Sequence, residues 1–234
     1  MANFSTDENL LTWEPDLFRN VAPQSQKLTQ GSDGVIRHSG TAVILSAATI
    51  GLVNAGITSG HVVYLEKKTT NATLYDVCIP VKSVATSTSC LLEAKTTACP
   101  TASSVTYRIS SFDAQHENAH FTLCQRWGID DDDLKTDNDE ADLYNRRQLR
   151  AVSCYDVLTH VFGGQMTSLD DLYAQKSETY AGHYSRALAA TKLEWDTDSD
   201  SEVDRTSRGG SIDLIVGDSG DAYPTTEFQR IEDE

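Results

Sequence analysis

The segment DAQHENAHFTLCQRWG, residues 113–128, decides the fold, because the chain changes character where it begins. Four of its side chains recur at helical spacing and would line one face of an α-helix. They are His116, His120, Leu123 and Trp127. Asp113 is a suitable N-cap residue, and Gly128 is a suitable C-terminal stop. We therefore expect a helix over this segment.

Upstream of this helix, residues 35–109 are rich in Thr, Val, Ser and Gly and show no sustained helical period. Short runs of alternating apolar and polar residues are separated by Gly, Asn, Thr and Pro, a pattern that predicts strands joined by turns. The expected strands are 42–47, 62–66, 74–84, 89–93 and 104–110. They predict a small antiparallel barrel or sandwich.

Downstream of the first helix, two further helices are expected. Apolar residues at helical spacing predict a second helix over 151–163, which ends at a pair of glycines. A third helix opens at Ser168, has Asp171 three residues later as a partial capping box, and is predicted to run to about Trp195. Its face carries Tyr173, Tyr180 and Tyr184, which is more amphipathic than a closed core needs. We expect these tyrosines to contact neighbouring chains.

The fold class is therefore α+β: an N-terminal small antiparallel β-barrel or sandwich, followed by a three-helix bundle and an extended acidic C-terminal tail. We expect residues 1–30 to form a docking arm, 31–112 the β-rich domain, 113–195 the helical core and 196–234 the tail. The apolar cluster of the arm includes Trp13 and Phe18. A short strand in the tail, with Ile212, Leu214 and Val216, could pair with an edge strand, including one on another chain.

The composition sets limits on function. The 234 residues carry a formal charge of −16, which repels phosphate and argues against direct binding to free nucleic acid or an anionic membrane. The five cysteines include no C-x-x-C pair, so we expect reduced thiols. No apolar run is long enough to span a membrane, and the N-terminus lacks the features of a signal peptide. These features predict a soluble intracellular protein.

The sharpest enzymatic signal is His116-Glu117-Asn118-Ala119-His120, which matches H-E-x-x-H on a predicted helix. A catalytic zinc needs a third protein ligand, and the extended form of the motif is absent. Glu140 and His160 are the remaining candidates for that ligand. We favour an interpretation in which both histidines line a helix contact, and we expect no catalytic residues and no bound cofactor.

Two further motifs are weaker. Asp196, Asp198, Asp200 and Asp204 match the alternating carboxylates of a calcium loop, but Ser201 stands where the turn glycine belongs. They could hold a structural divalent cation weakly, although a solvated acidic linker is favoured.

The second motif is the segment GDSGD, residues 217–221, which is similar to the nucleophile segment of trypsin-like proteases. Asp221 replaces the expected glycine there and would place a negative charge close to the oxyanion. A surface turn is favoured.

With these residues in view, the chain resembles the head-to-tail connector proteins of tailed phages, also called neck or adaptor proteins. The stretch WEPDLFR, residues 13–19, resembles their E-P-x-L-F-R arm, and AGITSGHVV, residues 55–63, resembles a β segment of theirs. RWGID, residues 126–130, a helix starting near Arg147 and a third helix with Tyr173 and Tyr180 resemble their helical core. DTDSD, residues 196–200, is similar to a tail element, without its glycine.

The resemblance implies a structural virion protein that binds the portal as a ring, commonly dodecameric, and extends the DNA channel towards the tail. Its expected partners are copies of itself, the portal, and a tail or stopper protein. Packaged DNA would pass through the lumen without specific binding. The expected location is the virion neck, after assembly in the host cytoplasm. The alternatives are a zinc-dependent hydrolase that uses the HENAH motif and a capsid decoration or tail-completion protein.

Overall fold

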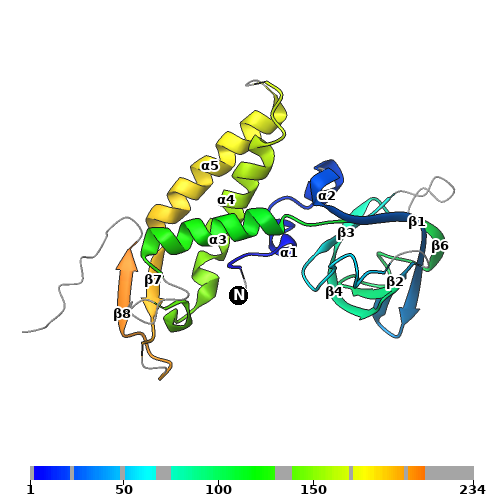
Figure 1. The fold of residues 1–234 in the computed structure, drawn as a ribbon, viewed down its shortest axis with the longest axis horizontal. Coiled ribbons are helices and arrows are strands. Elements are labelled where there is room, and N and C mark those ends of the chain that lie inside the picture. Colours follow the sequence, from blue (N-terminus) through cyan, green and yellow to red (C-terminus); the bar gives the residue numbers. More distant parts are fainter. Residues whose placement is uncertain are drawn as a thin grey trace, which may run out of the picture.

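The computed structural model describes residues 3–21, 24–47, 51–66, 75–129, 139–168, 171–197 and 200–208. In this part of the chain a closed barrel of six antiparallel strands lies beside a group of helices (Figure 1). The predicted α+β class and antiparallel barrel are therefore confirmed. Residues 3–21, which we call the arm, contain two short helices, α1 (Asp7–Leu10) and α2 (Leu17–Asn20). A 3-10 turn, η1 (Gln24–Gln26), leads into the barrel.

Around the barrel the strands follow the order β1-β2-β5-β4-β3-β6, and β6 pairs with β1 to close it. The strands are β1 (Lys27–Ser39), β2 (Ala42–Ser46), β3 (Val62–Leu65), β4 (Val77–Thr86), β5 (Ser89–Leu92) and β6 (Ala102–Ser110). All five predicted strands are present with small shifts of their ends. The longest strand, β1, was missed because its first half, Lys-Leu-Thr-Gln-Gly-Ser-Asp, is mostly polar. Residues 27–30, which the sequence assigned to the arm, are the first residues of this strand.

Alternating side chains fill the barrel. The interior residues include Ile36, Val43, Leu45, Cys90, Leu92, Val105, Tyr107 and Ile109, all of which are buried. Gly34 lies where β1 and β6 approach most tightly, because a Cβ atom there would lie 2.7 Å from the carbonyl oxygen of Val105. The pairing of β1 with β6 shifts its register on both sides of this glycine. A bulge of this kind lets a long strand bend enough to close a small barrel.

The first predicted helix is present as α3 (Asp113–Trp127), and Gly128 ends it with a φ of 62°. This left-handed conformation explains the glycine at that position. The expectation that Asp113 is the N-cap was wrong by one residue. Phe112 is the N-cap residue, and Asp113 is the first residue of the helix. Its carboxylate is therefore free to contact another part of the chain.

The second and third helices are α4 (Arg150–Gly163) and α5 (Leu172–Ala190). Asp171 is the N-cap of α5, so this helix begins later than predicted. The predicted extension to Trp195 was also wrong. The residues after α5 form β7 (Lys192–Trp195), which pairs with β8 (Arg205–Arg208). In β7, Leu193 and Trp195 are buried while the residues between and before them are less so, a period of two that belongs to a strand.

Two 3-10 helices, η2 (Glu140–Asp142) and η3 (Arg146–Leu149), precede α4. No helix in the described ranges is long and apolar enough to cross a membrane.

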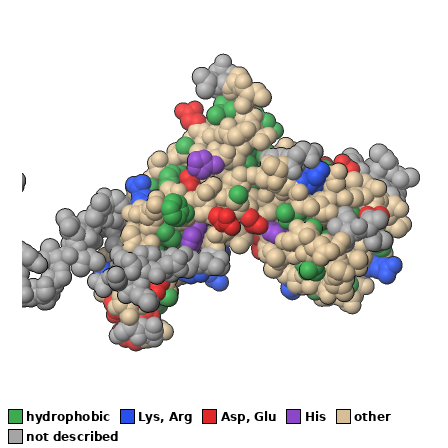
Figure 2. Space-filling view, viewed as in Figure 1, with side chains coloured by type: hydrophobic (Ala, Val, Ile, Leu, Met, Phe, Trp, Pro, Cys, Tyr) green, Lys and Arg blue, Asp and Glu red, His purple; other side chains and the backbone are tan. Residues whose placement is uncertain are grey.

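The arm joins the barrel to the helices. Leu10, Leu17 and Phe18 are buried in one apolar cluster with Val62 of β3 and several residues of α4. The ring of Phe18 lies 5.1 Å from that of Phe112, at the start of α3. The space-filling view shows a waist between the barrel and the helical part, with acidic side chains and a histidine gathered there (Figure 2). The arm thus acts as an internal brace of this chain.

Candidate functional site

The candidate functional site is the junction at which the arm, the barrel and α3 meet. Its polar side chains come from four elements or their edges, and all but one are buried. They are Ser5 and Asp7 of the arm, His61 before β3, Asp113 and His116 of α3, and Ser153 of α4. Buried polar groups are costly unless they are paired, so their contacts define what the junction can do.

Asp7 connects the arm to the start of α3. Its Oδ1 accepts a hydrogen bond from the backbone N–H of Phe112 (2.9 Å) and lies 3.3 Å from Nε2 of His116. A carboxylate at this position is also favoured by the partial positive charge of a helix N-terminus. The other oxygen, Oδ2, is buried and has no hydrogen-bond partner. Asp7 therefore holds two donors with one oxygen and leaves the second oxygen unsatisfied.

His116 continues this network into α4. Its Nδ1 lies 2.7 Å from Oγ of Ser5, which in turn lies 2.7 Å from Oγ of Ser153. The order Ser5, His116, Asp7 resembles a serine-hydrolase relay in composition. Its geometry differs, because in such a relay the serine faces Nε2 and the acid faces Nδ1, whereas the two nitrogens are exchanged here. All four side chains belong to residues that are at most 1% exposed, so the chain of contacts fastens the arm to α3 and α4.

His61 and Asp113 join the barrel to α3. The backbone N–H of Thr58 donates to Nδ1 of His61 (3.1 Å), so the ring proton sits on Nε2 and is directed at Oδ2 of Asp113 (3.0 Å). This hydrogen bond lowers the pKa of Asp113, while partial burial opposes the shift and the hydroxyl of Ser111 adds to it. Asp113 is thus held as a carboxylate by a histidine from the barrel.

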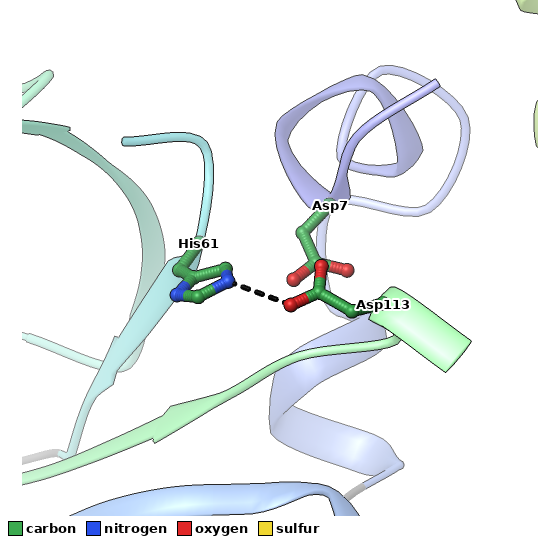
Figure 3. A group of neighbouring side chains, drawn as sticks. All are labelled: Asp7, His61 and Asp113. Carbon is green, nitrogen blue, oxygen red and sulfur yellow. Dashed lines mark hydrogen bonds and ion pairs between the residues drawn. The ribbon is translucent and has the colours of Figure 1, made fainter. Parts of the chain in front are cut away.

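Asp7, His61 and Asp113 are the candidate metal ligands of the described ranges. One oxygen or nitrogen atom from each lies within 4.8 Å of those from the other two, and no other group of three His, Cys, Asp or Glu side chains does so among the residues described. Figure 3 shows the two carboxylates turned towards each other, with the His61 ring beside them. None of these three roles was found from the sequence. Asp7 and His61 carry no local motif, and Asp113 was interpreted only as a helix cap.

The two histidines of the HENAH segment contact different acidic residues. His116 contacts Asp7, whereas His120 lies 3.6 Å from Glu140 and packs against the ring of Phe4. Glu117 is exposed on α3. The structure thus brings Glu140 to one histidine of the motif but not to both. The other candidate ligand, His160, is largely exposed and lies 3.6 Å from Asp156 of its own helix.

Three aspartates of the predicted calcium loop, Asp196, Asp200 and Asp204, lie between β7 and β8. Asp196 accepts hydrogen bonds from the backbone N–H groups of Asp200 and Ser201, and Asp204 accepts them from Thr197. Ser201 adopts a φ of 70°, the conformation for which the sequence pattern calls for glycine. Asp198 lies outside the described residues, and the other three do not form a group that could hold a metal among those described.

The predicted interface residues have different environments. Trp13 is 41% exposed and packs on Tyr155, whereas Phe18 is buried within its own chain. Tyr173, Tyr180 and Tyr184 are half-buried. The tail residues Ile212, Leu214 and Val216 and the GDSGD segment lie outside the described residues.

Tyr180 also ties α5 to the arm. Its hydroxyl donates to Glu14 (2.9 Å), which also pairs with Lys176 (2.7 Å). Burial raises the pKa of the Tyr180 hydroxyl, and the hydrogen bond to Glu14 raises it further. The tyrosine therefore remains a donor at neutral pH.

Comparison with known proteins gave no match, whether with models of protein families, with curated proteins or with solved structures. Family membership and function are therefore proposals, which follow from the residues and the geometry alone.

Proposed function

We propose that this chain is a structural virion protein, a phage head-to-tail connector that binds the portal as a ring and extends the DNA channel. The observation that carries the proposal is the distribution of exposed apolar side chains. The two most exposed of those described lie on the helical part, Phe121 of α3 (61% exposed) and Leu172 at the start of α5 (63%). Isolated exposed apolar residues are common, but Leu172 borders a hollow in the surface.

The hollow near Leu172 is about 300 Å³ in volume and is formed by the arm, α4 and α5. Its lining residues are Glu14, Leu17, Asn20, Phe162, Leu172, Tyr173 and Lys176. A ring of more than two copies needs two different and complementary patches on each subunit, because each copy contacts one neighbour with one patch and the next neighbour with the other. Phe121 and this hollow supply two such patches on separate helices.

The internal bracing of the chain supports the same proposal. A connector must transmit force between capsid and tail without changing shape, and here the arm crosses from the barrel to α3, α4 and α5 through buried contacts. The net charge of −16 fits a channel that DNA passes through, because an acidic wall repels phosphates. The helical part would contact neighbouring subunits and the portal, and the barrel would face outward or towards the tail.

The ring is tested with charged substitutions at the two patches. We expect the wild-type chain to form rings, alone or on portal rings, in negative-stain images and in native mass spectra. Phe121→Asp and Leu172→Asp should each leave monomers. Val53→Asp is the matched control, since Val53 has a similar exposure (59%) but lies in the connection between strands β2 and β3 of the barrel.

Mixing the two variants makes the test sharper. In a ring built from two different patches, Phe121→Asp retains an intact hollow and Leu172→Asp retains an intact Phe121, so the mixture should give dimers and no rings. Restored rings, or assembly by either variant alone, would contradict the arrangement. If the chain binds tails or capsids but never portal rings, a tail-completion or decoration role replaces the connector role.

A further inference from the structure

We propose that the junction binds a divalent cation of the Mg²⁺ or Mn²⁺ type, held by the carboxylates of Asp7 and Asp113. His61 would not be a ligand but would orient Asp113. The ion would join the arm to the start of α3. This site is separate from the HENAH motif and from the aspartate loop, and it does not depend on the connector function.

The unsatisfied oxygen of Asp7 is the observation that points to a ligand. Asp7 is 1% exposed, its Oδ1 is fully used by Phe112 and His116, and its Oδ2 has no partner. A buried carboxylate oxygen without a partner is costly, and buried carboxylates in proteins are normally paired or bound to metal. Figure 3 shows the Asp7 carboxylate directed at that of Asp113. Two negative groups so close together repel each other unless a cation lies between them.

The separation of the two groups suits one ion. Oxygen ligands of Mg²⁺ lie at about 2.1 Å and those of Ca²⁺ at about 2.3–2.6 Å, so two oxygens on one ion can be about 3–5 Å apart. The donor atoms of the junction lie within 4.8 Å of one another. Asp113 is 57% exposed at its side chain, which leaves room on one side for the water molecules that Mg²⁺ and Mn²⁺ retain.

The role of His61 follows from its hydrogen bonds. The N–H of Thr58 donates to Nδ1, so Nε2 carries the proton and has no lone pair to offer a metal. That proton instead holds Oδ2 of Asp113 at 3.0 Å and leaves Oδ1 for the ion. Ligating carboxylates are commonly oriented by a neighbouring donor in this way. His116 does the same for Asp7, so each acid has one oxygen fixed by a histidine.

The helix N-terminus is the competing explanation for two acids at this place. The partial positive charge of the helix N-terminus stabilises a nearby anion modestly. The N–H of Phe112 at this end of the helix already donates to Oδ1 of Asp7. It leaves Oδ2 without a partner, whereas a cation satisfies Oδ2 and removes the repulsion. The cation therefore accounts for more of the observed geometry.

The first experiment titrates Mn²⁺ into chelator-treated full-length protein and counts bound ions by electron paramagnetic resonance. The acidic tail could bind ions as well, so the deciding quantity is the difference in bound Mn²⁺ between wild type and the variants. Wild type should bind one Mn²⁺ more than Asp113→Asn, and Glu178→Gln, which removes an equal charge from the exposed face of α5, should match wild type. At about 100 times the Kd, Mn²⁺ should raise the Tm of wild type by roughly 5–10 °C, and Asp113→Asn should lose this shift.

The second experiment needs no substitution. In a two-dimensional amide NMR spectrum, small amounts of Mn²⁺ should broaden the signals of residues 6–8, 59–61 and 111–114 first. If these signals persist while others vanish, or if Asp113→Asn binds as many ions as wild type, the site does not exist. Loss of ring formation by the patch variants has no bearing on these results, so the two proposals fail separately.

Discussion

Replacing Asp7 with alanine should destabilise the protein by about 3 kcal/mol. The substitution leaves two buried donors without acceptors, the N–H of Phe112 and Nε2 of His116. Each such loss costs about 1–3 kcal/mol, and removal of the unsatisfied Oδ2 returns part of it. Since 1 kcal/mol corresponds to about 2–4 °C in a chain of this size, the Tm should fall by about 6–12 °C.

The assay is urea denaturation followed by circular dichroism, in a buffer with chelator so that bound ions do not contribute. Asp7→Asn is the informative companion, because its amide oxygen can still accept both hydrogen bonds while its NH₂ group faces Asp113. It should cost less than about 1 kcal/mol. Asp16→Ala is the control: it removes an acid of the same arm that forms a surface pair with Arg19, and it should change stability by less than about 1 kcal/mol. If alanine at position 7 cost no more than asparagine, the hydrogen bonds of Oδ1 would not be what holds the arm.

The remaining predictions concern single positions. Gly34→Ala should destabilise the barrel by about 1–3 kcal/mol, because the new Cβ would lie 2.7 Å from the carbonyl oxygen of Val105. Gly182→Ala on α5 meets nothing closer than 3.9 Å and should stabilise the protein by about 0.5–1 kcal/mol. Thermal melts of both variants test the two predictions together. The backbone N–H groups of Thr167, before α5, and of Ala174, in its first turn, lower the pKa of Asp171 to about 2. The cap therefore contributes stability above the unfolded pKa near 4 that is lost as the pH falls towards 2. Asp171→Asn should therefore flatten the acid limb of a plot of Tm against pH, and an unchanged limb would contradict the cap. Cys78 is the only partly exposed cysteine among the five, all of which are described, so it should react first with a thiol reagent, though slowly, since burial raises its pKa to about 11; mass spectrometry of the labelled peptides identifies the site.

Local patterns were enough to predict much of the fold. Strands β2 to β6 of the barrel and the helices α3 and α4 follow from alternation and helical spacing within ten to fifteen residues. Two errors arose where a local pattern was weak or ambiguous. The first half of β1 pairs only with β6, not with β2, and its side chains are at most partly buried, so its sequence lacks an alternating apolar pattern. The stretch from Lys192 to Trp195 was predicted as helix, but its pairing with β8, which no local pattern reveals, makes it a strand.

The candidate site could not be predicted in the same way. Asp7, His61 and Asp113 are separated by more than fifty residues at each step, and none stands in a metal-binding motif. Their proximity depends on how the arm crosses the finished barrel. The HENAH motif shows the reverse case, a local motif whose residues do not share one site. Its spacing is right for a zinc site, but tertiary contacts give His116 and His120 different acidic partners.

The bracing arm has a consequence for synthesis on the ribosome. Strand β1 cannot close the barrel before β6 has emerged, and Leu10 and Phe18 cannot find their pocket before α4 is complete. The arm therefore leaves the exit tunnel more than a hundred codons before α4, and its apolar side chains stay exposed during that time. A nascent chain of this design exposes apolar arm residues early, and the arm can connect the barrel to α4 only after that helix is complete.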